Sequence, residues 1–125
     1  MPKNDFISPH WLPLPEEHDY PAAASYLALL WHPDKVAATV SALRRAEITR
    51  FKAKDIFRAS QLSLLGVSNS HVEKDRQKII NHKPLSPLLL VRDSDPARVV
   101  IADGYHRLCA VYGLNEDALI PCKIV

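Results

Sequence analysis

Glycine, cysteine and net charge are all scarce in this chain of 125 residues. It has 3 glycines and 2 cysteines, against 10 prolines, and its formal net charge is +2. Because Cys109 and Cys122 form no Cys-x-x-Cys pair, they do not suggest a zinc site, and we expect buried free thiols. A net charge this small does not by itself indicate a nucleic-acid partner.

Long apolar runs and targeting signals are also missing. No run reaches the roughly 20 residues that a membrane-spanning helix needs, and the N-terminus lacks the basic and apolar regions of a signal peptide. We therefore expect a cytoplasmic protein with no membrane partner. A hydrophobic content of 47% is enough for a core in a chain of single-domain length.

The few net charges are unevenly placed. Residues 1–46 carry four Lys/Arg and five Asp/Glu, whereas residues 47–125 carry twelve and nine. A mild basic bias in the second part suits phosphate ligands, and it equally suits an ordinary surface.

Apolar periodicity and chain breakers predict a small mixed α+β fold. After an irregular lead at residues 1–20, a helix is predicted over 21–31, with Tyr26, Leu27 and Leu30 as its core stripe, and a second helix follows to about Ala46. These two helices form an N-terminal extension, 1–46, to a domain at 47–125. There we expect a short helix or turn at 53–60, a helix at 70–81 with its N-cap among Ser68, Asn69 and Ser70, and a short helix ending before Gly113. The predicted strands are 48–52, 88–92, 99–102 and 120–125, with a turn at 93–96.

The segment that follows Val99 carries the main functional signal. A β-branched apolar run ends at Asp103-Gly104, and a short amphipathic helix begins directly afterwards. Gly104 permits an unusual backbone angle or the close approach of a ligand, and the first turn of a helix offers unpaired N–H groups. His106 and Arg107 add side-chain donors at the same end, so the segment predicts an anion or phosphate site.

A purely structural interpretation of the same residues stays open. Asp-Gly is a common turn, so Gly104 could serve only the turn, and Arg107 could serve only to pair with Asp103.

Four segments in order resemble the ParB/sulfiredoxin superfamily. Asp103-Gly-Tyr-His-Arg-Leu-Cys-Ala110 resembles its Gly-x-x-Arg-x-x-Ala signature, which is Gly-Glu-Arg-Arg in ParB proteins, Gly-Cys-His-Arg in sulfiredoxins and Asp-Gly-His-His-Arg in free serine kinases. The other three segments, at 51–58, 84–92 and 120–125, resemble the opening strand and turn, the strand before the signature and the closing strand. The resemblance covers residues 47–125 and implies a nucleotide, ATP or a relative, held with Mg²⁺ at Gly104, His106 and Arg107.

The resemblance also implies polar contacts to the nucleotide from the predicted helix at 70–81. His71, Lys74 and Lys78 share one stripe there, and the two ammonium groups could neutralise phosphates. A solvated face explains the stripe equally well. Asp103 is the candidate catalytic residue, as a Mg²⁺ ligand or as a general base in phosphoryl transfer, although it could also simply close the turn.

Two differences between this sequence and the family's patterns reduce the number of functions to be expected. Tyr105 stands where sulfiredoxins have their nucleophilic cysteine, so we expect no sulfinic-acid reduction. The chain ends directly after the predicted closing strand, and without a helix-turn-helix we expect no sequence-specific DNA binding. The leading hypothesis is a nucleotide-binding protein, with phosphotransfer or nucleotide hydrolysis as the open question. The alternatives are a ParB-like module that binds DNA or a partner without catalysis, and a fold member whose N-terminal helices serve only assembly, for instance in a homodimer.

Overall fold

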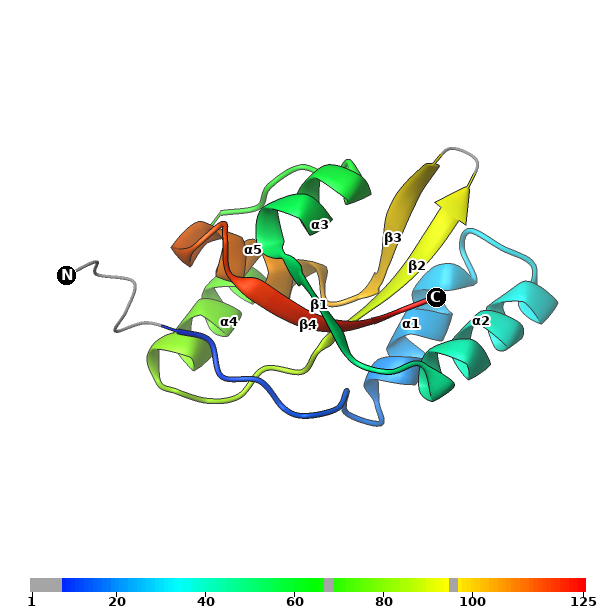
Figure 1. The fold of residues 1–125 in the computed structure, drawn as a ribbon, viewed down its shortest axis with the longest axis horizontal. Coiled ribbons are helices and arrows are strands. Elements are labelled where there is room, and N and C mark those ends of the chain that lie inside the picture. The colour runs from blue at the N-terminus through cyan, green and yellow to red at the C-terminus, as the bar shows by residue number, and fades with distance from the viewer. Residues whose placement is uncertain (1–7, 67–68, 95–96) are drawn as a thin grey trace.

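The computed structural model describes residues 8–66, 69–94 and 97–125 (Figure 1). Within them lie five helices and one four-stranded sheet, so the predicted α+β class is confirmed. The elements in chain order are α1 (Asp19–Leu27), α2 (Pro33–Arg45), β1 (Thr49–Lys52), α3 (Ala53–Ser60), α4 (Ser70–Ile80), β2 (Leu88–Ser94), β3 (Ala97–Asp103), α5 (Tyr105–Leu114) and β4 (Leu119–Ile124).

The sheet is mixed, as predicted, and its strand order is β1-β4-β2-β3. The outer pairs β1/β4 and β2/β3 are antiparallel, and the central pair β2/β4 is parallel. Because β2 is a central strand, its first four residues, Leu88 to Val91, are buried on both faces. This explains why the sequence there is a continuous apolar run without alternation.

Helices cover both faces of the sheet (Figure 1). Leu88 and Leu90 pack with side chains from α3, α4 and α5, whereas Leu89 and Val91 pack with side chains from α1 and α2. Side chains alternate along a strand, so the two cores lie on opposite faces. The N-terminal helices thus share one sheet with the part of the chain that carries the signature segment.

The predicted core stripe of the first helix is right for Leu27 and wrong for Tyr26 and Leu30. Tyr20, Ala23 and Leu27 form the buried face of α1, whereas Tyr26 and Leu30 are 43% and 39% exposed. The helix begins earlier than predicted, at Asp19, and ends at Leu27 rather than at residue 31. Both stripes have helical spacing, and packing against the sheet selects the one that contains Ala23.

The predicted C-terminal role of Gly113 is also wrong. Gly113 lies inside α5, because the helix ends at Leu114 and Asn115 is its C-cap. Leu114 packs partly against the core, which favours the extra residue of helix.

Other local predictions have mixed outcomes. Asn69 caps α4 as predicted, since its Oδ1 accepts hydrogen bonds from the backbone N–H groups of His71 and Val72. Ser68 and residues 95–96 of the predicted turn lie outside the described residues, and β2 extends through 93–94. Both cysteines are buried free thiols, and burial raises the pKa of Cys122 to about 11. Within the described ranges, no helix is long and apolar enough to cross a bilayer.

Candidate functional site

The junction between β3 and α5 forms the turn that the sequence singled out. Gly104 is the N-cap of α5 and has a φ of 110°, a region that side chains rarely adopt. A Cβ at this position would lie 2.7 Å from Leu88 Cγ and 2.9 Å from Arg107 Nη2. The backbone therefore approaches both neighbours more closely than any residue except glycine allows.

Arg107 is held by Asp103 across this turn. Its Nη2 donates a hydrogen bond to Asp103 Oδ2 at 2.6 Å, and each side chain is 17% exposed. Arg107 Nε is buried and has no hydrogen-bond partner within the described residues. The structural pairing that the sequence left open is present, and it leaves one buried guanidinium N–H unused.

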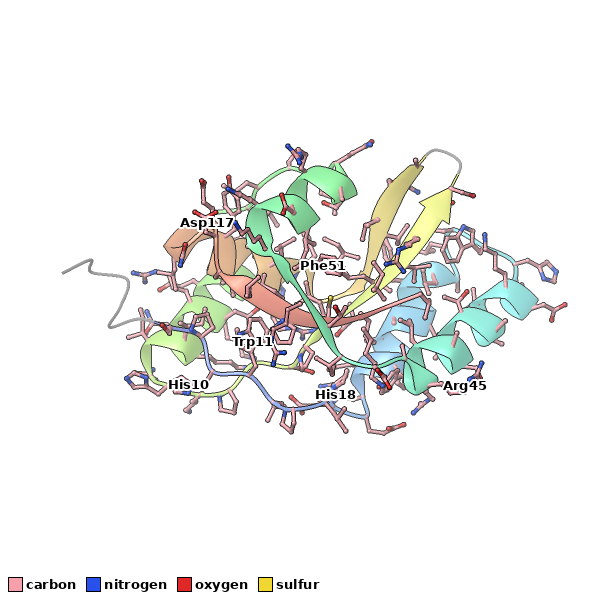
Figure 2. The ribbon with its side chains drawn as sticks, in the orientation of Figure 1. His10, Trp11, His18, Arg45, Phe51 and Asp117 are labelled. Atoms are coloured by element: carbon pink, nitrogen blue, oxygen red, sulfur yellow. The ribbon has the colours of Figure 1, made fainter. Side chains whose placement is uncertain are left out.

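Asp103 lies close to three ionisable side chains, those of Arg107, Asp19 and His18. Burial raises the pKa of its carboxyl group, and the Arg107 guanidinium opposes that rise. The carboxylate of Asp19 adds to the rise, whereas His18 opposes it. Asp19 is itself buried at the start of α1 and accepts hydrogen bonds from the Ser86 hydroxyl and the Glu16 backbone N–H. Figure 2 shows His18 directly before α1, and Asp19 is the first residue of that helix, so the start of α1 lies close to Asp103.

Helix α4 adds an aspartate that the sequence reasoning missed. Burial raises the pKa of the half-buried Asp75, and Arg107 opposes the rise most strongly, followed by Lys78, His106 and Lys74. The available signal was the i, i+3 spacing of Asp75 and Lys78, which places this acid beside a lysine of the basic stripe. Asp75 thus belongs to the same charged cluster as Arg107.

Two histidines connect α4 to α5. The ring centroids of His71 and His106 are 4.9 Å apart, with the planes inclined by 37°. The ring of Tyr105 lies 5.5 Å from that of His106, and its hydroxyl donates a hydrogen bond to the Ser63 carbonyl. Two of these rings belong to the first turn of α5, and the ring of His71 packs beside them from α4.

A pocket of about 460 Å³ opens at the same turn. Residues 103–106 belong to its lining and contribute the polar side chains of Asp103, Tyr105 and His106. Ala22 and Tyr26 of α1 and Leu62, after α3, contribute apolar surface. The pocket therefore joins a polar turn to an apolar wall.

The predicted site residues fall into two groups. Asp103, Gly104 and His106 line the pocket, whereas Arg107, Lys74 and Lys78 do not. Lys74 is exposed and Lys78 half-buried on α4, and the positive charges of both oppose the rise in the pKa of Asp75. His106 connects the groups, because it lines the pocket and also contacts His71 of α4.

Metal ligands do not converge in the part of the chain that the structure describes. No group of three or more His, Cys, Asp or Glu side chains is placed to hold a metal ion there. Asp103 is the one carboxylate among the residues that line the pocket. One carboxylate together with ligand phosphates matches the way Mg²⁺ is usually held.

Comparison with protein-family models, with curated proteins and with solved structures finds no match. The resemblance to the ParB/sulfiredoxin superfamily accordingly stays a prediction. The features that point to a function are the turn at Gly104, the charged cluster around Arg107 and the pocket beside them.

Proposed function

We propose that this protein is a ParB/sulfiredoxin-like nucleotide-binding protein that holds the phosphates of ATP or a related nucleotide at the Gly104–Arg107 turn. The first turn of α5 supplies backbone N–H donors, and His106 supplies a side-chain donor. Arg107 supplies permanent positive charge close behind the turn, and its guanidinium geometry matches phosphate oxygens.

The observation that carries the proposal is the bare N-terminus of α5 beside a pocket. No side chain caps this helix, and its first turn has no acidic residue. The other described helices differ: His32 and Asn69 cap α2 and α4, and α1 and α3 have Asp19 and Asp55 in their first turns. The N–H groups of a helix start and the positive end of the helix dipole favour an anion from the ligand.

Asp103 completes the proposed site. With phosphates bound, its carboxylate would hold Mg²⁺ from the protein side, and the ion would neutralise phosphate charge. In a phosphoryl transfer the same carboxylate would accept the proton of the attacking hydroxyl. Its ion pair with Arg107 fixes its orientation for either role.

A thermal-shift screen tests the proposal. ATP, ADP, CTP, GTP and inorganic tripolyphosphate are each added with Mg²⁺, and a ligand at 100 times its Kd stabilises the native state by about 2.7 kcal/mol. We expect a rise of several degrees in Tm with at least the triphosphates. No shift with any of them would refute nucleotide binding.

Variants then locate the site. His106→Ala should reduce the ATP-induced shift without lowering the Tm of the free protein by more than a few degrees. Arg45→Ala is the matched control, because Arg45 is exposed on α2, bound only to Ser41 and far from the turn (Figure 2). An equal loss of ATP response in both variants would indicate non-specific attraction.

A further inference from the structure

The pocket beside the signature turn has a lining of mixed polarity. Asp103 and His106 contribute polar side chains at the start of α5. The rest of the lining includes Ala22 and Tyr26 from α1, Leu62, and residues 101–102 of β3. A volume of about 460 Å³ lies within the usual range of small-molecule sites, roughly 300–1,000 Å³.

The apolar wall is exposed although it consists of large hydrophobic side chains. Tyr26 is 43% exposed and Leu62 is 43% exposed. Tyr26 comes from the helix whose buried face is formed by other residues, so the core does not need its ring. An accessible aromatic ring in the same pocket as a phosphate-type site is suited to stacking a planar group.

We propose that α1 forms the nucleoside subsite of this protein, with the base stacked on Tyr26 and against Leu62 while the phosphates lie at the turn. This inference rests on the proposed nucleotide binding and deepens it. It gives the N-terminal helix a role in ligand recognition, although residues 1–46 lie outside the family resemblance.

The polarity of the pocket also sets the specificity. Beyond the turn, the Tyr26 hydroxyl is the one side-chain polar group among the pocket-lining residues that can meet a base edge. Discrimination between bases needs several placed donors and acceptors. Affinity should therefore follow stacking area, so that ATP and GTP bind alike and both bind more tightly than CTP.

Calorimetric titration with ATP, CTP and inorganic tripolyphosphate, each with Mg²⁺, tests the subsite. The variants are Tyr26→Ala, Tyr26→Phe and Phe51→Ala, the last because Phe51 is a similarly exposed aromatic, at 38%, on β1 and away from the pocket (Figure 2). In Tyr26→Ala we expect ATP to bind about ten- to a hundredfold more weakly, and tripolyphosphate to bind as before. Tyr26→Phe and Phe51→Ala should bind ATP like the wild type.

The outcomes separate the two proposals. If the wild type binds both ATP and tripolyphosphate and Tyr26→Ala leaves the ATP affinity unchanged, the subsite is refuted and the phosphate site stands. If the wild type binds neither ligand, the proposed function fails and the subsite fails with it. Leu62→Ala provides a second test should Tyr26→Ala not fold, because Leu62 lies outside the helices, and it should weaken ATP more than tripolyphosphate.

Discussion

Arg107 Nη2 and Asp103 Oδ2 lie 2.6 Å apart, and the two side chains are equally buried. The pair joins the last residue of β3 to the first turn of α5 and closes around Gly104. Arg107 therefore has two tasks in this account: it stabilises the turn, and its charge attracts phosphate.

Arg107→Ala should consequently lower both stability and nucleotide affinity. The variant leaves Asp103 partly buried without its partner, which costs about 1–3 kcal/mol of unfolding free energy. Loss of the positive charge close behind the turn should weaken ATP binding by about ten- to a hundredfold. Arg107→Lys should recover only part of each effect, because an ammonium group cannot match the paired geometry. Urea denaturation and calorimetry measure the two effects separately.

The double variant Asp103→Asn/Arg107→Ala is the control for stability. It removes both charges, so its unfolding free energy should exceed that of Arg107→Ala alone. An Arg107→Ala variant that binds ATP like the wild type would leave Arg107 with the structural task only.

Gly104→Ala should destabilise the protein, because the φ of 110° and the contacts with Leu88 and Arg107 leave no room for a Cβ. A loss of about 1–3 kcal/mol is expected from the strained backbone conformation. Gly113→Ala is the matched control: Gly113 lies inside α5 with open space around it, so the variant should gain about 0.5–1 kcal/mol. Chemical denaturation measures both, and equal effects of the two substitutions would contradict this view of the turn.

Asp75→Asn should stabilise the protein at neutral pH. Burial raises the folded-state pKa of Asp75 above its unfolded value, so the folded state binds a proton more tightly. This contribution is present below the unfolded pKa and is lost as the pH rises through the folded pKa. The variant's advantage in unfolding free energy should therefore be largest near pH 7 and shrink toward pH 4. Denaturation curves across this range check the sign, and an advantage that grows on acidification would contradict it.

The protein should not reduce a sulfinylated peroxiredoxin in the presence of ATP. Tyr105 replaces the required thiol, and burial raises the pKa of its phenol, which keeps it protonated. Cys109 is buried, and burial raises its pKa as well. Mass spectrometry of the peroxiredoxin measures the reaction, and turnover that is lost in Cys109→Ser would overturn the prediction.

The sequence predicts where helices and strands lie better than it predicts which side of a helix is buried. The run at Leu88–Val91 indicates a buried strand because it is apolar throughout, and the cap at Asn69 depends on neighbouring residues only. The face of α1 could not be predicted, since two stripes satisfy the same periodicity and only the sheet decides between them.

The candidate site shows the same division. The turn at Gly104 follows from local sequence, because a strand, a glycine and a helix start are contiguous. Asp75 comes close to Arg107 because of how α4 packs, and Tyr26 reaches the pocket because of how α1 packs. Local sequence patterns do not predict either packing arrangement.

The central claim is that phosphates bind to the N–H groups of α5. Titration of ¹⁵N-labelled protein with tripolyphosphate and with ATP, followed by amide chemical shifts, tests it most directly. Large, saturable shifts are expected at Tyr105, His106 and Arg107, and ATP should add shifts in α1 around Tyr26. Amides of α5 that stay unchanged while those of another helix start respond would contradict it.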